Sequence, residues 1–376
     1  MSDYSFDLRK EAWIPVILSS GETTRCGLER ILCDAHTIKA IALPNPLDAV
    51  ALYRVLITLS HCVTGDPGNV DEWKKIRNAG EYDADAVSSY FDRFGDRFDI
   101  FHNEYPFMQT GGLVQTDSGG KASPSSVSVM LSEIASGNNK TLFDHHVDDE
   151  DVLLSPIDAA YAVIRAQYLS LGGIAKKHSN LVEYQPNFLS SPLVSGTSVL
   201  VSGSNLFETL LFNTVPTSSR NAFESRYPDG DVPNWERGKD LRTGKDVAVD
   251  GYLDYLTLKS RHLRLEPRET DAGIVVPRVH ITQGARAAVP AGAEPFFYWR
   301  ENKDGEWYSP QLNPDRAMWR DSAALLAYAD QSKDSAGRAV RASLPVRFAS
   351  VRRERREPRV RVEEIGRASC RERVSF

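Results

Sequence analysis

The 376-residue sequence has only four cysteines and no Cys-x-x-Cys pair. This scarcity excludes the common disulfide scaffolds and structural zinc sites, and it is typical of a reducing cytoplasm. The sequence also lacks a membrane-length apolar run: the longest, residues 49–63, contains Arg54 and falls short of the roughly 20 residues that cross a bilayer. The N-terminus MSDYSFDLRK has no apolar signal core. We therefore expect a cytoplasmic protein without a membrane partner.

Several catalytic motifs are missing as well. The sequence contains no GxxxxGK[ST] loop, no GxSxG elbow and no HExxH pair. Hydrolysis of nucleoside triphosphates, serine acyl transfer and zincin chemistry therefore lack their minimal parts. From these patterns we expect no catalytic residues, no metal and no cofactor.

Charge is distributed unevenly along the chain. Forty-five Lys and Arg against 51 Asp and Glu give a formal net charge of −6. Residues 141–151 read TLFDHHVDDED, whereas arginine recurs between residues 338 and 373. Such runs are typical of a solvated surface, and a basic run is also typical of nucleic-acid contact. The residues alone leave both interpretations open.

Periodicity predicts a mixture of helices and strands. Ser155-Pro156-Ile157-Asp158 combines a capping residue with proline at the first helical position, which predicts a helix from Pro156 to about Leu171. Strands do not alternate regularly with helices, so we expect an irregular α+β domain of short antiparallel sheets and helices. Further helices are predicted over residues 47–62, 83–101, 205–213 and 314–330, and strands over 13–18, 199–202, 261–265, 274–281, 295–300, 344–351 and 358–363. In the predicted helix 83–101, the aromatic residues Tyr90, Phe91, Phe94 and Phe98 lie on one stripe, which is typical of a core face.

The last residues differ in character from the rest. Residues 364–376, EIGRASCRERVSF, resemble a translated sequencing adapter. We therefore expect residues 1–363 to form one native domain and residues 364–376 to be a foreign tail. The native part would then stop within the predicted strand 358–363, where charged residues and valine alternate.

One local motif suggests chemistry. Leu142-Phe143-Asp144-His145-His146 resembles the signature of the DHH phosphoesterases, in which imidazoles and carboxylates bind divalent metals that activate water. That family also needs an upstream carboxylate motif, but the matching element, Pro228-Asp229-Gly230-Asp231, follows Asp-His-His instead of preceding it. A metal-dependent phosphodiesterase is therefore the alternative function.

Four segments in order resemble a different family. They are Glu11–Val16 (EAWIPV), Glu104–Thr110 (EYPFMQT), Ser195–Asn213, which begins Ser-Gly-Thr, and Leu253–Leu265, which ends SRHLRL. Together they resemble CasA, the large subunit of type I-E CRISPR Cascade complexes, over roughly residues 13–363. We expect Trp13, Phe107 and Met108 to be core or subunit-contact residues.

The resemblance implies sites on nucleic acid. In CasA a loop reaches the crRNA 5′ handle and the motif-bearing duplex, and it corresponds by order to residues 138–150, with Phe143, Asp144 and His145 at its tip. A hairpin that reaches the minor groove corresponds to residues 296–308, with Arg300 and Lys303 as the candidates. In this segment Asp304-Gly305 is a turn pair, and alternating aromatic residues flank it. The arginines expected to attract phosphates are Arg352, Arg353, Arg355 and Arg356.

The resemblance also implies a function and partners. CasA is a non-catalytic subunit that recognises the protospacer-adjacent motif in double-stranded DNA and promotes R-loop formation. Its partners are the other Cascade subunits, crRNA, target double-stranded DNA and a recruited helicase-nuclease. The family's glutamine wedge and C-terminal four-helix bundle would follow residue 363, so we expect both to be missing from this chain.

Overall fold

The computed structural model of the chain describes residues 4–131, 152–220, 223 and 231–311, and the backbone of residues 346–354 and 357–365. The predicted helix 314–330 lies outside these residues. The N-terminal part begins with an antiparallel sheet in the order β2-β1-β3, in which Ile14 of β1 pairs with Cys26 of β2. Its elements are β1 (Ile14–Leu18), β2 (Thr23–Cys26), α1 (Leu28–Cys33) and β3 (Ile38–Ile41).

Helix α2 (Pro46–Val63) is the central helix of the protein. Asn45 caps its first turn by accepting a hydrogen bond from the backbone N–H of Leu47 at 2.9 Å, and Pro46 follows the cap. Among the described residues α2 alone is long and apolar enough to cross a membrane, but 72% of it is buried inside the protein, as in a core helix. It packs against α5 (Pro156–Leu169), α6 (Leu206–Phe212) and α7 (Tyr252–Thr257).

The predicted helix over residues 83–101 is shorter in the structure. Helix α4 (Ala84–Phe94) ends before Gly95, and a 3-10 turn, η1 (Gly95–Arg97), follows. The aromatic stripe still forms part of the core, because the rings of Phe91 and Phe98 lie 5.1 Å apart. The neighbouring helix α3 spans Val70–Ala79.

The second half of the chain supplies most of the strands. The long hairpin of β10 (Arg261–Thr270) and β11 (Gly273–Gln283) extends the two strands predicted there, and Arg261 pairs with Gln283. The remaining strands are β4 (Gln115–Thr116), β5 (Ser125–Ser126), β6 (Gly173–Ser179), β7 (Gln185–Phe188), β8 (Ser198–Val201), β9 (Gly244–Val247), β12 (Ala285–Ala287), β13 (Arg300–Glu301), β14 (Trp307–Tyr308), β15 (Val346–Glu354) and β16 (Glu357–Ile365).

The sheets are small and lie around the helical core. Their orders are β10-β11-β5, β4-β6-β7 and β16-β15-β8, with the pairs β13-β14 and β12-β9, and only β12-β9 is parallel. Besides η1, the described residues contain the short 3-10 turns η2 (Val127–Met130), η3 (Pro192–Ser195), η4 (Thr217–Ser219) and η5 (Asn234–Glu236). The predicted α+β class of short antiparallel sheets and helices is confirmed.

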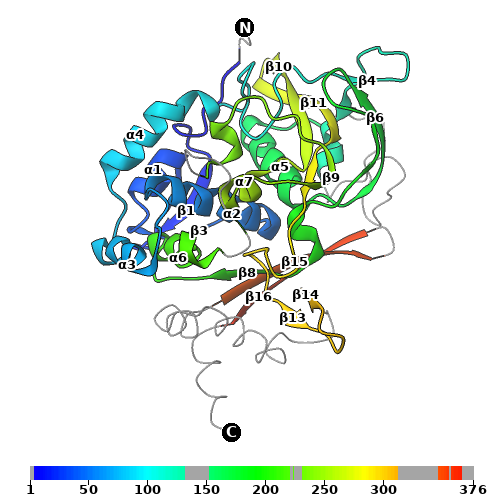
Figure 1. Cartoon of the computed structure of the whole chain (residues 1–376). Coiled ribbons are helices and arrows are strands. Elements are labelled where there is room, and N and C mark those ends of the chain that lie inside the picture. Colours follow the sequence, from blue (N-terminus) through cyan, green and yellow to red (C-terminus); the bar gives the residue numbers. More distant parts are fainter. Residues whose placement is uncertain are drawn as a thin grey trace.

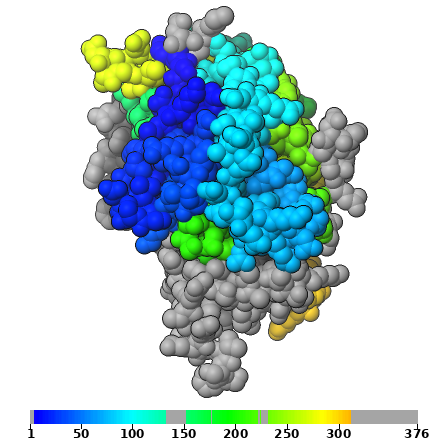
Figure 2. All heavy atoms as spheres, turned by 90° about the vertical axis from the view of Figure 1, so that its left-hand side faces the viewer, coloured from blue at the N-terminus to red at the C-terminus, as the bar shows by residue number. Residues whose placement is uncertain are grey.

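The hairpins β10-β11 and β13-β14 lie at opposite ends of the molecule. In Figure 1 the tip of β10-β11 is at the top, whereas β13-β14 lies at the bottom beside β8, β15 and β16. Figure 2 shows that N-terminal residues cover the helical face, with the orange hairpin region at its lower edge. The fold therefore presents β13-β14 and the sheet β16-β15-β8 at one end.

Candidate nucleic-acid interface

The candidate residues are only partly within the described chain. The predicted loop tip, Phe143, Asp144 and His145, lies outside it, as do Arg355 and Arg356. Arg300 and Lys303 lie on the hairpin β13-β14, and the backbone positions of Arg352 and Arg353 lie on β15. The structure therefore brings the hairpin candidates close to one edge of the sheet that carries the arginine-rich strands.

The hairpin is built around Asn302. Its side-chain Oδ1 accepts hydrogen bonds from the backbone N–H groups of Asp304 and Glu306, both at 2.9 Å. Gly305 takes φ +81°, a conformation that favours glycine, as the Asp-Gly pair predicts. Arg300 pairs with Tyr308 in the register. The predicted turn is confirmed.

The aromatic flank before the turn differs from the prediction. Residues 295–300 were predicted as a strand, but strand β13 begins only at Arg300. Phe296, Phe297 and Tyr298 are instead buried, and this segment touches β8 through a single bridge between Phe297 and Ser198. Burial of consecutive aromatic side chains replaces the two-residue alternation of a half-exposed strand.

Lys303 is exposed at the turn, whereas Arg300 is half-buried. The exposed carboxylates Glu301, Asp304 and Glu306 outnumber these two cations in the same hairpin. The hairpin alone therefore carries more negative than positive side chains and creates no positive field. Two large apolar side chains are also exposed on the hairpin, Trp307 at 39% and Tyr308 at 42%.

The third recognisable segment holds the base of the hairpin. The hydroxyl of Thr197 donates to the carbonyl of Pro310 at 2.6 Å, and its backbone N–H donates to Ser309 Oγ at 3.2 Å. A Cβ at Gly196 would overlap Ser309 Oγ and the ring of Phe297. The Gly-Thr pair thus lets the two ends of the hairpin approach β8 closely.

The sheet β16-β15-β8 lies next to this base. Phe348 of β15 pairs with Val199 of β8, and Arg352 is registered opposite Arg359 of β16. Successive strand positions alternate between faces, so positions 352 and 353 lie on opposite faces of the sheet. The register groups position 352 with 359 and 361 on one face. Position 353 belongs to the opposite face of this sheet.

The second and fourth recognisable segments interlock. The backbone N–H of Thr110 donates to the carbonyl of Leu263 at 2.9 Å, and Gln109 Oε1 accepts from the N–H of Leu265 at 2.9 Å. Met108 takes a left-handed φ of 52°, and Gln167 Nε2 donates to its carbonyl at 2.8 Å. The Pro-Phe-Met-Gln-Thr segment therefore fixes the edge of β10. Trp13, Phe107 and Met108 are buried core residues, as predicted.

A series of hydrogen bonds connects Lys259, Thr110 and His262 to the backbone of Arg242. Lys259 Nζ donates to Thr110 Oγ1 at 3.2 Å, and Thr110 Oγ1 lies 2.9 Å from His262 Nδ1. His262 Nε2 lies 2.9 Å from the carbonyl of Arg242, which only an N–H can satisfy. His262 Nε2 therefore carries a proton, and in the neutral ring Nδ1 accepts a hydrogen bond from the Thr110 hydroxyl. Burial, reinforced by the charge of Lys259, lowers the pKa of His262 to about 4.

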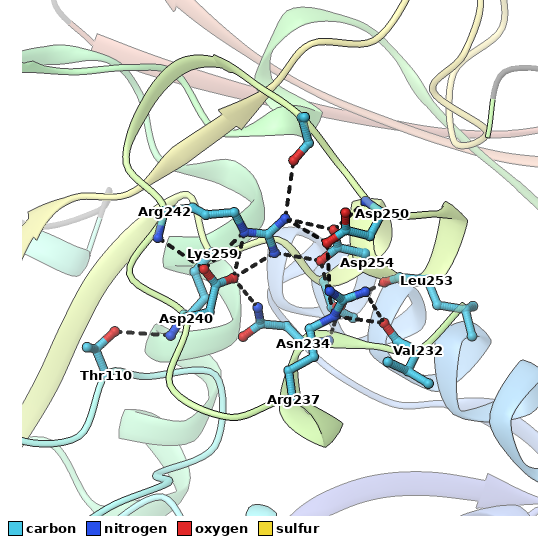
Figure 3. A network of polar contacts seen from close by, with 12 residues as sticks. Thr110, Val232, Asn234, Arg237, Asp240, Arg242, Asp250, Leu253, Asp254 and Lys259 are labelled. Carbon is cyan, nitrogen blue, oxygen red and sulfur yellow. Dashed lines mark hydrogen bonds and ion pairs between the residues drawn. The ribbon is translucent and has the colours of Figure 1, made fainter. Parts of the chain in front are cut away.

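Ion pairs around Arg242 connect this series of hydrogen bonds to helix α7 (Figure 3). Arg242 binds Asp240 at 2.7 Å and Asp254 of α7 at 2.7 Å, and Arg237 binds Asp250 at 2.8 Å. The guanidinium of Arg242 holds the pKa of Asp240 far below its ordinary value, although burial opposes this shift. Burial lowers the pKa of Lys259 to about 8. This network could not be recognised in the sequence, because its members lie between Thr110 and His262 and form no local motif.

The phosphodiesterase alternative gains no support from the described part of the chain. Within it, no group of three or more His, Cys, Asp or Glu side chains could hold a metal ion. Asp231 instead caps α7, since its carboxylate accepts from the backbone N–H groups of Leu253 at 2.7 Å and Asp254 at 3.2 Å. Asp144, His145, His146 and residues 228–230 lie outside the described residues.

Comparison with known proteins agrees with the four recognisable segments. Residues 7–372 match the family model of CRISPR-associated protein Cse1. CRISPR-associated protein CasA/Cse1 of Thermus thermophilus is 30% identical over 330 residues, which are 85% of this chain and 60% of the relative. The chain therefore spans about 60% of the length of this curated relative.

Solved structures share the fold. Cse1 from Acidimicrobium ferrooxidans superposes with a TM-score of 0.76 at 24% identity, covering 97% of this chain and 71% of that one. A chain of a CRISPR RNA-guided surveillance complex superposes with a TM-score of 0.72 at 21% identity, covering 96% of this chain and 76% of that one. At these identities the likeness concerns the fold. From the family match and the curated relative, the chain belongs to the Cse1 (CasA) family of CRISPR-associated proteins.

Proposed function

We propose that this chain is a non-catalytic, nucleic-acid-binding part of an RNA-guided surveillance complex, which recognises the protospacer-adjacent motif in double-stranded DNA and promotes R-loop formation. Its partners would be other Cascade subunits, crRNA and target double-stranded DNA, and a recruited helicase-nuclease would cleave the target. The observation that carries the proposal is an exposed hairpin, β13-β14, whose base is hydrogen-bonded to Thr197, in a chain of the Cse1 family.

The mechanism divides recognition between RNA and protein. Pairing between guide and target reads the long sequence, and the protein reads only a short duplex motif. Exchange of a DNA duplex for an RNA–DNA duplex is nearly balanced in free energy, so a few kcal/mol of protein contact at the motif decides where unwinding begins. A small, rigid contact is sufficient for this task.

We assign the contacts as follows. Arg300 or Lys303 enters the minor groove of the motif, where a side chain distinguishes mainly A·T from G·C pairs. Lys303 is exposed at the turn and so suits this role. Phe143, Asp144 and His145 order their loop against RNA and duplex by stacking and hydrogen bonding. Phosphate attraction comes from Arg352, Arg353, Arg355 and Arg356.

The register of β15 and β16 refines the last assignment. Positions 352 and 353 lie on opposite faces of the sheet, so one duplex cannot lie against both from the same side. Position 352 shares its face with Arg359 and Arg361, which gives that face the greater number of arginine positions. We therefore place the phosphate backbone on the face of Arg352.

The proposal is tested with the family-length protein assembled with its partner subunits and crRNA. Phe143→Ala should weaken binding to a motif-bearing duplex by about 1–3 kcal/mol, the range for loss of one base-stacking contact. Unchanged binding would contradict the assignment of the loop. The phosphodiesterase alternative predicts that protein with Mn²⁺ hydrolyses a dinucleotide and that His145→Ala abolishes the turnover. We expect no turnover from either protein.

A further inference from the structure

Arg54 and Glu294 form an ion pair in the interior, far from the exposed end of the hairpin. Arg54 Nη1 lies 2.7 Å from Glu294 Oε1, and their side chains are 0% and 5% exposed. Arg54 belongs to the largely apolar helix α2, and Glu294 shortly precedes the hairpin β13-β14. The pair therefore joins the central helix directly to the chain that enters the hairpin.

Aromatic rings enclose the guanidinium. The Cζ atom of Arg54 lies 5.3 Å from the ring centre of Tyr168, 5.4 Å from that of Tyr255 and 5.0 Å from that of Phe296. Arg54 Nε also donates to the carbonyl of Leu256 at 3.0 Å. These contacts fix the guanidinium between α2, α5 and α7, so its position does not depend on the hairpin alone.

Glu294 forms hydrogen bonds with several residues of the segment that leads into the hairpin, residues 295–299. Its carboxylate also accepts from Tyr255 Oη at 2.6 Å and from the backbone N–H of Phe296 at 3.0 Å. Its carbonyl accepts from Trp299 Nε1 at 3.1 Å and from the backbone N–H of Phe297 at 3.2 Å. One residue thus determines the path of the chain up to Trp299, the residue before β13.

Stability alone does not explain such a pair. Exchange of a buried ion pair for apolar side chains of similar volume often leaves stability unchanged or raises it, because both charges lose their hydration. A geometric role accounts for the arrangement better, since the charged and hydrogen-bonded contacts of Glu294 are directional. Thr197 holds the other end of the hairpin through Pro310 and Ser309, so the hairpin is fixed at two points.

We infer that Arg54 and Glu294 are positioning residues, which set the direction in which β13-β14 presents Lys303 to the duplex. This inference rests on the proposed function for its consequence in DNA binding, but its structural part concerns the hairpin alone. It predicts that loss of the pair releases the hairpin locally and leaves the rest of the core intact.

The test uses Arg54→Met combined with Glu294→Leu in the family-length protein, alone and assembled with its partner subunits and crRNA. We expect backbone amides of residues 299–308 to exchange hydrogen about tenfold faster or more, with the amides of α2 nearly as protected as before. The unfolding midpoint should fall, because Tyr255 Oη, the Leu256 carbonyl and the Phe296 N–H lose their buried partners. In the assembly, affinity for a motif-bearing duplex should fall severalfold. The matched control is Arg165→Met with Asp48→Leu, which removes a largely buried pair between α2 and α5, 3.4 Å apart, and should leave the hairpin protected.

A milder variant covers the case in which the double variant does not fold. Tyr255→Phe removes one hydrogen bond to Glu294 and keeps the pair, and it should raise exchange in the same segment by a smaller factor. Unchanged exchange in both variants, or in Tyr255→Phe alone if the double variant is unfolded, overturns the inference. If the wild-type assembly does not prefer the motif-bearing duplex, the proposed function fails, and the exchange result still decides the positioning role.

Discussion

The carboxylate of Asp254 accepts two hydrogen bonds from the guanidinium of Arg242, at 2.7 and 2.8 Å, with its own side chain fully buried. Asp254 also accepts the backbone N–H of Asp250 at 2.9 Å. One side chain of α7 therefore orders the irregular segment between η5 and β9 and joins it to the helical core.

Loss of this charge should destabilise the fold strongly. Asp254→Asn removes the fully buried carboxylate that binds Arg242, but Asp240 still pairs with Arg242, so the cost should be at or below the about 3–5 kcal/mol that breaking a buried pair costs. We expect a matching fall in the free energy of unfolding, measured by urea denaturation. Asp71→Asn is the control, because its pair with Lys74 is exposed at 86% and 45%, and it should change stability by about 1 kcal/mol or less.

Acid should unfold the protein through His262. Its pKa is about 4 in the folded protein and about 6.5 in the unfolded chain, so between these values the unfolded state binds more protons. The contribution of His262 to the free energy of unfolding is therefore fully present above pH 6.5. It falls by about 3 kcal/mol as the pH drops toward 4. Lys259, Arg242 and Asp240 are the charged groups around it, and all three keep their charge over most of this range.

The corresponding variant is His262→Gln, with stability measured from pH 7.5 to 4.5. Gln has no titrating group, so the decline between pH 6.5 and 4.5 should become shallower even if the variant is less stable at pH 7.5. A decline of the same slope in both proteins would show that other groups, such as the buried His61, cause the acid sensitivity.

Gly196 should be essential for the base of the hairpin. A methyl group there overlaps the ring of Phe297 and Ser309 Oγ, so Gly196→Ala should cost about 1–3 kcal/mol as an overpacked contact. It should also lower affinity for the motif-bearing duplex, because the hairpin shifts. Gly238→Ala is the matched control, since no heavy atom lies within 4 Å of the added carbon. Equal stability and binding of the two variants would contradict the close approach.

Local signals in the sequence predicted those elements whose stability is local. Ser155-Pro156 begins helix α5 as its capping chemistry predicts, and the periodicity over residues 47–62 places helix α2 within one residue of its observed ends. The segment 295–300 was mispredicted because apolar alternation does not distinguish a paired strand from an extended buried segment. Gly95 ended α4 early, where the aromatic spacing alone suggested continuation.

Long-range pairs could not be predicted from local patterns. Arg54 was visible in the sequence as a charge within an apolar run, and a charge in that position signals a buried partner. Nothing in the local sequence identifies Glu294 as that partner. The same applies to Gln109 and Leu265, whose contact depends on the edge of β10. The candidate nucleic-acid residues came from family resemblance, and only the turn geometry around Asp304-Gly305 could be predicted from the residues themselves.

The central claim is that this chain reads a short duplex motif through the hairpin β13-β14. Its most direct test is the ratio of affinities of the assembled complex for two duplexes that match the guide equally and differ only in the motif. The wild-type ratio should exceed one, and Arg300→Ala or Lys303→Ala should bring it close to one while binding to the motif-free duplex changes little. A wild-type ratio of one, or a ratio that both variants leave intact, would contradict the account.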